Sequence, residues 1–533
     1  MRMASNGRFA TPEGLIFILL MLLILGLFRS RAFNDPGSLW HVRVGEIILT
    51  EGFPWTDPFT YTHADRLWIP QQWLGEVGMR LAYGLSGFDG LLLGMAVLIA
   101  GLWTLIFSRL LVAGMGWPLA AAVTALSLFV SSYHFYVRPH MATMVFLGWT
   151  VASVVDFDRD RASLWRIAGL IPVFVLWTNI HGGVLGGIVT LLVAVAGWIG
   201  MGLFCRGRGW TRVSSLARST TPREALLLVG IAGACVLAPL VNPFGLEMLR
   251  TWQRIVGSEV LPKIVIEHRP LDPTSATGAA VLLLAGFYLL LLGGALLRTP
   301  QEFRLTWLIP MLWLVMTLQG IRQGPLFAIV TAIVIADLWP ATIWYGWLRS
   351  HGDWLAVEPA LEPRRTVPGL TTWVLAVLSV LVCVAVQTAG FPLPLVGAGW
   401  AKLDERWIPL DLTPVIHQTL QQAGPSARFF NDANLGGYFI FFHPDQKIFM
   451  DDRCELYGDR WLADYAAVVH ERPQDFERWD QQYKFAWAIL QSDPKQPTAL
   501  ERYLSHSSRW RSLPEGIGQG ARLFVRNSES GLE

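Results

Sequence analysis

Ionisable and amide side chains of this sequence are concentrated in short segments that separate long apolar runs. Their types suit three kinds of chemistry. A carboxylate accepts a proton from a reacting hydroxyl or amine, a guanidinium matches the oxygens of a phosphate, and imidazoles grouped with a carboxylate can hold a metal ion. In chain order these side chains are Asp35, His41, Asp57, Arg138, His140, Asn179, His181, Asn242, Glu267, His268, Arg269 and Arg322.

A further polar group follows the apolar stretch "KIFM" in the C-terminal part of the chain: Asp451, Asp452 and Arg453. An Asp at the end of a strand in an α/β domain often marks a site. The alternative is a structural ion pair that faces the rest of the protein. Gly436 and Gly437, a little earlier, are typical of a turn.

The elements that position these residues are predicted from composition. Of the 533 residues, 53% are hydrophobic and only 15% are charged, whereas a soluble globular protein carries about 25% charged residues. This deficit indicates a multi-pass membrane protein. The net charge of +2 implies no nucleic-acid partner, and neither a nucleotide nor a haem is expected. The four cysteines (Cys205, Cys235, Cys383 and Cys454) have no spacing typical of a disulfide pair or a zinc site.

Apolar runs of roughly 17–25 residues predict membrane spans. About eleven are expected, the first of them uncleaved. They lie near residues 13–29, 88–108, 117–134, 141–157, 165–180, 183–204, 225–241, 278–297, 304–319, 325–343 and 369–388.

The orientation of the chain is predicted from Lys and Arg in short loops, which favour the cytoplasmic side. One loop holds five arginines: Arg206, Arg208, Arg212, Arg218 and Arg223. This loop places the N-terminus in the cytoplasm and the segment 30–87 and everything after about 389 outside. All the polar residues named above then fall on the outer face. Polar groups near membrane depth are costly and usually mark a site, so one shared outward-facing cavity is expected.

From about residue 389 the composition becomes polar and mixed. Five apolar stretches between turn residues predict strands: "ARFFND", "GGYFIFF", "KIFMDDR", "FAWAILQ" and "ARLFVR". Three others have helical spacing: "DLTPVIHQTLQQAG", "RWLADYAAVVHE" and "TALERYLSH". The predicted fold is therefore an α-helical multi-pass membrane domain over residues 1–388, with a first outer loop over 30–87, and an extracytoplasmic α/β domain over 389–533.

Several motifs together resemble the GT-C class of membrane glycosyltransferases. After the first span, an outer loop opens on Asp and continues with "GFPWTDPFTYTHADR", which is similar to the catalytic subunit of oligosaccharyltransferase. "FFNDANLGGYFIFF" resembles a degraded form of the "WWDYGY" segment of those enzymes but lacks the tryptophan pair. The closer resemblance is to bacterial GT-C-like multi-pass proteins. It rests on Asp35, Trp40, His41, Gly45, Asp57, Pro58, Trp73, Asn179, His181, Asn242, Asp452, Arg453 and Tyr457.

This resemblance implies a glycosyltransferase in the cytoplasmic membrane. Such an enzyme takes a sugar or glycan from a polyprenyl-phosphate donor at the outer face, in the periplasm or outside the cell, for cell-envelope glycan or glycoprotein assembly. The acceptor, a glycan, lipid or protein, is left open. The alternatives are a non-catalytic scaffold or a transporter of lipid-linked glycan on the same fold. The sequence lacks the paired halves with matching broken helices that are typical of many transporters.

The resemblance assigns the catalytic carboxylate to the start of the first outer loop, which is Asp35, with Asp57 as the second candidate. For both, a turn or helix cap before Pro is the structural alternative. Arg138, Arg269 and Arg322 are the candidates for binding the donor phosphate, against the alternative of interfacial arginines. Asn179, Asp451, Asp452 and Arg453 are assigned to the acceptor or to a domain interface. For Asn179, close helix packing beside two glycines is the alternative.

A divalent cation is the one cofactor considered. The resembling oligosaccharyltransferases hold such a cation with carboxylates, including an acidic pair in the second outer loop. Here that loop, "SSYHFYVRPH", has no carboxylate. His41, His140, His181, Glu267 and His268 are the alternative ligands, or else they form a polar pocket of hydrogen-bonded side chains.

Overall fold

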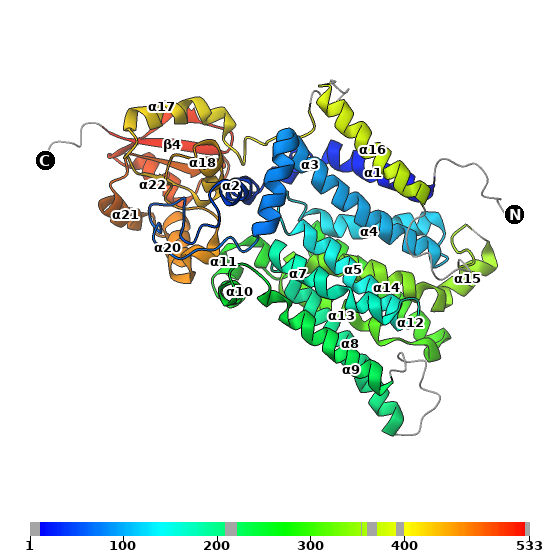
Figure 1. Cartoon of the computed structure of the whole chain (residues 1–533). Helices are drawn as coiled ribbons and strands as arrows, with labels where there is room; N and C mark the ends of the chain where they lie inside the picture. Colours follow the sequence, from blue (N-terminus) through cyan, green and yellow to red (C-terminus); the bar gives the residue numbers. More distant parts are fainter. Residues whose placement is uncertain (1–10, 208–220, 353, 360–369, 391–398, 528–533) are drawn as a thin grey trace.

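The chain folds into a helical membrane domain with a smaller α/β domain at one end (Figure 1). The structure, a computed structural model, describes residues 11–207, 221–352, 354–359, 370–390 and 399–527. The fold class predicted from the sequence is thereby confirmed. Most of the arginine-rich loop (208–220) and the segment 391–398 beside the expected domain boundary lie outside the described residues.

Within the described residues, sixteen α-helices precede the domain boundary near residue 389. They are α1 (Pro12–Leu27), α2 (Gly37–Thr50), α3 (Trp73–Val112), α4 (Trp117–Ser132), α5 (Met141–Asp158), α6 (Leu164–Ala168), α7 (Leu170–Ile180), α8 (Val184–Gly207), α9 (Pro222–Leu237), α10 (Leu246–Val256), α11 (Leu261–Ile264), α12 (Ala276–Arg298), α13 (Ile309–Gln319), α14 (Gly324–Leu338), α15 (Ile343–His351) and α16 (Leu370–Thr388).

Among the described residues, seven helices are long and apolar enough to cross a membrane. Four of the eleven expected runs correspond instead to shorter apolar helices, at Pro12–Leu27, Trp117–Ser132, Leu164–Ile180 and Leu305–Gln319. The span that contains α14 is 89% buried, and α14 packs against α3, α4, α5, α12 and α13. It is therefore the centre of the bundle, whereas α16, 11% buried and packed against α1, lies at its edge.

The helix α3 extends the bundle into the expected first outer loop. It begins at Trp73, and its backbone leaves the helical conformation at Ser86 and Gly87. Gly87 has a φ of +62°, which a residue with a Cβ adopts only at a cost. The short segment before this kink packs against α2, so α2 is fixed on the end of the bundle that faces the α/β domain (Figure 1).

The α/β domain is built on a four-stranded sheet with the order β1-β2-β4-β3. β1 (Phe429–Asn431) runs parallel to β2 (Trp487–Gln491), and β4 (Ala521–Arg526) runs antiparallel to both β2 and β3 (Trp510–Ile517). Its helices are α17 (Thr413–Ala423), α18 (Gly436–Phe442), α19 (Cys454–Tyr457), α20 (Asp459–His470), α21 (Phe476–Tyr483) and α22 (Ala499–His506).

Two strand predictions for this domain are wrong, and the strand β3 was not predicted. "GGYFIFF" is the helix α18, and "KIFMDDR" forms a single β-bridge at Ile448 rather than a strand. A run of seven apolar residues does not distinguish a buried strand from a buried helix. Packing decides here, because a Cβ on Gly437 would collide with the Pro36 carbonyl oxygen. The two glycines thus begin a helix that lies against α2, not a turn.

The first loop is pinned to the α/β domain by backbone and side-chain contacts. Ile448 donates its N–H to the Phe59 carbonyl and accepts from the N–H of Tyr61, at 3.0 and 3.1 Å. The Tyr61 hydroxyl donates to the Phe429 carbonyl at 2.7 Å. The loop therefore adds an extended segment to this domain, although it is separated from it in sequence by the whole helical bundle.

A buried ion pair locks this contact. Arg453 is fully buried and donates to Asp57 of the first loop and to Asp451, both at 2.6 Å. Burial raises the pKa of Asp57, but Arg453 and the hydrogen bonds from Thr60 and Phe59 bring it below its ordinary value. The pair thus stabilises the fold above the ordinary pKa of Asp, and that stabilisation is lost as the pH falls below about 3.9.

Removing the guanidinium should loosen the α/β domain from the bundle. We expect Arg453→Met to destabilise the protein by about 3–5 kcal/mol, because it leaves two carboxylates buried without their counter-charge. Thermal unfolding in lipid nanodiscs and the rate of proteolysis in the first loop measure the effect. Arg478→Met, which breaks an exposed pair with Asp464, is the matched control. Equal melting of the two variants would contradict this account of the lock.

Candidate functional site

Asp35 lies where the first loop enters α2, at the junction between the bundle and the α/β domain. Its Oδ1 accepts from the N–H of Gly37 at 2.8 Å, and its Oδ2 accepts from Arg138 at 3.0 Å. The side chain keeps 12% of its surface exposed, and that of Arg138 keeps 26%. Asp35 therefore holds the turn before α2, as in the structural alternative, and its carboxyl group is also partly exposed.

Asp452 approaches the same place from the α/β domain. It accepts a hydrogen bond from the indole N–H of Trp40 at 2.7 Å. Burial raises the pKa of Asp452 to about 7, and the negative charges of Asp35 and Asp451 add to this effect, while Arg138 opposes it. Two carboxyl groups therefore interact with the Arg138 guanidinium. Asp35 forms an ion pair with it, whereas Asp452 takes up a proton as the pH falls through about 7.

His41, one residue after Trp40, is buried on the same helix. Its Nδ1 lies 3.0 Å from Glu76 of α3, and its ring centroid lies 3.7 Å from that of Trp40, with the two rings tilted by 37°. Burial holds the pKa of His41 well below its ordinary value, and Arg138 acts in the same direction. The neutral ring therefore shares one hydrogen bond with Glu76, so that α2 is fixed against α3.

A second group of polar side chains lies at the same end of the bundle. His134 and Glu267 form a pair at 3.3 Å, and Arg322 contacts the Nε2 of His268 at 2.6 Å. Burial raises the pKa of Glu267, but His134, Arg138 and Arg322 together lower it to about 2. Glu267 is therefore charged and interacts with both guanidinium groups, which places Arg138 and Arg322 around one polar region.

Two of the predicted histidines and Asn179 have structural partners within the described residues. His140 contacts the His134 carbonyl through Nε2 at 2.9 Å. His181 accepts from the N–H of Gly183 through Nδ1 at 3.0 Å. Asn179 accepts from the Trp73 indole and donates to the carbonyls of Val175 and Val241. Each of these contacts fixes a loop or a helix end close to the polar region.

The remaining candidates are separate from this region. Arg269 is exposed, and its nearest hydrogen-bond acceptor is the Lys263 carbonyl, at 3.5 Å. The buried ion pairs described above contain Asp57, Asp451 and Arg453. These residues therefore stabilise the contact between the first loop and the α/β domain. Asn242 closes a turn through the N–H of Phe244 at 2.7 Å.

The described residues do not offer a ligand set for a metal ion. No group of three or more His, Cys, Asp or Glu side chains in those ranges could hold one. His41 is instead paired with Glu76, His134 with Glu267, and His268 with Arg322. Of the candidate divalent-cation ligands, His41, Glu267 and His268 therefore contact other side chains, whereas His140 and His181 contact backbone groups.

Three contributors to the site were missed from the sequence: Glu76, His134 and the indole of Trp40 as a donor. His134 stands only four residues before Arg138 in the same loop, which was a usable signal. Glu76 and Trp40 carried no such signal, because their partners are remote in the chain. Trp40 and Asp452 are 412 residues apart.

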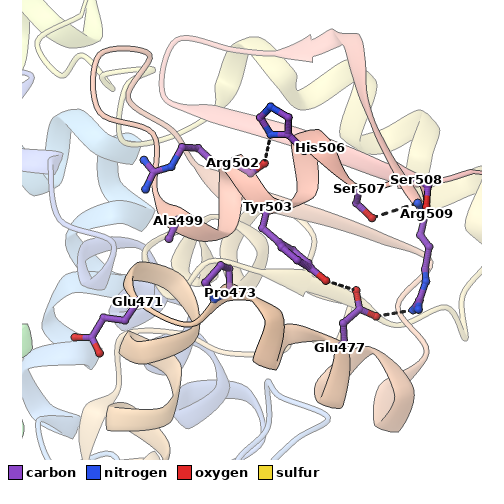
Figure 2. A pocket seen from close by; sticks show the side chains of 10 residues that line it. All are labelled: Glu471, Pro473, Glu477, Ala499, Arg502, Tyr503, His506, Ser507, Ser508 and Arg509. Carbon is purple, nitrogen blue, oxygen red and sulfur yellow. Dashed lines mark hydrogen bonds and ion pairs between the residues drawn. The ribbon is translucent and has the colours of Figure 1, made fainter.

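A cavity of about 720 Å³ lies away from this junction, within the α/β domain (Figure 2). Its lining residues belong to α20–α22 and the segments next to them, and none of the candidates named above lines it. A much smaller hollow, of about 10 Å³, lies between Trp68, Glu247 and Glu455. We place the candidate site at the junction because the partly exposed opposite charges are gathered there.

Solved structures with a similar arrangement of the chain include two proteins. ArnT from Cupriavidus metallidurans, in the apo state, is 13% identical over 97% of this chain and 98% of its own, with a TM-score of 0.45. The oligosaccharyltransferase of Archaeoglobus fulgidus, in complex with Zn and sulfate, is 10% identical over 90% of this chain and 68% of its own, with a TM-score of 0.46.

No family model and no curated protein sequence matches the chain. At these identities and scores the two structural likenesses concern the arrangement of the chain alone, and they carry no information about its substrate.

The raised pKa of Asp452 has a spectroscopic consequence. Because the folded protein favours the protonated form, a carboxylic-acid C=O band should be present at about pH 5 and should disappear as the pH rises through about 7. Infrared difference spectra of the parent and of Asp452→Asn isolate this band from those of other buried carboxyl groups. Identical difference spectra for the two proteins would show that Asp452 does not titrate in that range, which would contradict the raised pKa.

Proposed function

We propose that this chain is a glycosyltransferase that takes a sugar or glycan from a polyprenyl-phosphate-linked donor at the outer face of the cytoplasmic membrane. The acceptor belongs to a glycan or glycoprotein of the cell envelope. The observation that carries the proposal is the partly exposed Asp35 carboxylate, held against Arg138 at the end of the helical bundle. A lipid-linked donor reacts at such a place, because its tail stays in the bilayer while its sugar lies at the surface.

Sidedness supports the choice of the outer face. α8 ends at Gly207 and α9 begins at Pro222 at the end of the bundle away from the α/β domain (Figure 1), and most of the arginine-rich segment lies between these two residues in the sequence. Short arginine-rich loops favour the cytoplasm. The junction that holds Asp35 is then outside, together with the α/β domain.

In the proposed reaction, the acceptor hydroxyl or amine attacks the anomeric carbon of the donor sugar. The bond from that carbon to the phosphate oxygen breaks, and its electron pair leaves with the phosphate. Asp35 takes the acceptor proton. Its carboxylate has about four lone-pair positions, and the contacts with Gly37 and Arg138 use two of them.

The departing phosphate gains negative charge, which guanidinium groups stabilise through charge-assisted hydrogen bonds. Arg138 and Arg322 suit this role because both interact with Glu267 and so surround one region. Asp35 pairs with Arg138, and His268 contacts Arg322, so the two guanidinium groups are held in place before the donor arrives. Such preorganisation lowers the ordering cost of binding.

The role of Asp35 is tested by its neutral analogue. We expect Asp35→Asn to lower transfer from radiolabelled polyprenyl-phosphate sugars by about 10²–10⁴-fold, the usual contribution of a general base, while the fold is retained. Asp65→Asn, an exposed position of the same loop, should behave like the parent. Equal rates for the Asp35 and Asp65 variants would exclude the catalytic role. Such a result would favour the scaffold or transport alternative.

The role of Arg322 is tested through donor affinity. Arg322→Gln should raise the donor KM roughly tenfold to a hundredfold, because a charge-assisted hydrogen bond is worth about 1.5–3 kcal/mol. Arg250→Gln removes an exposed guanidinium of α10 and is the charge-matched control. An unchanged KM in Arg322→Gln, with the control also unchanged, would remove Arg322 from the donor site.

A further inference from the structure

The cleft in the α/β domain is the feature that the proposed reaction does not use. It holds about 720 Å³, which is within the usual range of about 300–1,000 Å³ for small-molecule sites. The helices α21 and α22, the residues between α20 and α21, and the segment before β3 form its walls. The charged and aromatic lining includes Glu471, Glu477, Arg502, Tyr503 and Arg509.

The chemistry of the lining is polar and balanced in charge. Pro473 and Ala499 are the aliphatic members, so the cleft offers little to a lipid tail. Two glutamates stand against two arginines, which does not favour a polyanion such as a nucleic acid. The lining thus offers hydrogen-bond donors from the arginines, acceptors from the glutamates, two serine hydroxyls and the Tyr503 ring. This combination suits a ligand with many hydroxyl groups.

One wall of the cleft is held in place by Glu477 of α21. Its carboxylate accepts from the Tyr503 hydroxyl at 2.9 Å and pairs with Arg509 at 2.5 Å (Figure 2). The Tyr503 ring is therefore fixed across the cleft between α21 and α22. Arg502, by contrast, is exposed, and its guanidinium donates a hydrogen bond to the Pro497 carbonyl at 2.5 Å. Its guanidinium has further donors for a ligand.

We propose that this cleft binds a neutral oligosaccharide, with the Tyr503 ring as its stacking surface and Arg502 as a hydrogen-bond donor. Resting on the proposed transferase function, the bound chain is the acceptor. In Figure 1, α21 and α22 lie on the side of the domain away from the bundle. An acceptor held there must be extended to reach Asp35, so the transferase acts on an oligosaccharide rather than on a single sugar.

The test measures binding by calorimetry with the full chain in lipid nanodiscs, without any donor present. The probes are maltotetraose, chitotetraose, mannotetraose and xylotetraose, with a heparin-derived tetrasaccharide as the anionic comparison. Tyr503→Ala and Arg502→Ala should each weaken binding of the preferred neutral probe by roughly tenfold or more. Arg478→Ala, an exposed arginine of α21 that does not line the cleft, should bind like the parent.

Saturable binding of a neutral probe that both cleft variants weaken supports the proposal. The proposal is overturned if no neutral probe binds, if the cleft variants bind like the control, or if the anionic tetrasaccharide is preferred. The cleft proposal and the transferase proposal are separated by measuring both probe binding and sugar transfer, for the parent and for Asp35→Asn. Binding without any transfer by the parent would leave a glycan-binding domain and refute the transferase, whereas Asp35-dependent transfer without binding would refute the cleft alone.

Discussion

The junction of this protein depends on one buried guanidinium. Arg453 has no exposed side-chain surface, and it pairs with Asp451 beside it and with Asp57, 396 residues away. The rings of Phe59 and Trp68 cover it at 4.9 and 4.5 Å. A buried charge is costly unless it is paired in good geometry. The first loop and the α/β domain therefore have one favourable relative position, and the neighbouring Asp452 is carried to Trp40 and Asp35.

That position creates two electrostatic environments within one small region. Asp35 is partly exposed and pairs with Arg138, whereas burial raises the pKa of Asp452 to about 7. His41 is neutral, and Glu267 is charged. Groups whose pKa values are pushed apart by their surroundings are typical of sites that move protons. The arrangement thus suits the proposed reaction, in which one carboxylate takes a proton beside two arginines that we propose to bind the donor phosphate.

Much of the fold could be predicted because span length and loop charge are local properties. Every expected apolar run corresponds to a helix, although four of these helices are shorter than a span usually is. One misread segment was "GGYFIFF", a helix that lies in contact with Pro36, far away in the chain. The site was less predictable. Arg322 and Arg269 look alike in the sequence, but only their tertiary surroundings show that the first faces Glu267 and the second faces outward.

The measurement that tests the central claim most directly is a cryo-EM structure of the full chain in nanodiscs with a polyprenyl phosphate. The account predicts that the phosphate lies between Arg138 and Arg322, close to Asp35, and that the lipid tail follows the surface of the bundle. A phosphate bound at another place, or no density at this junction at saturating lipid, would contradict it.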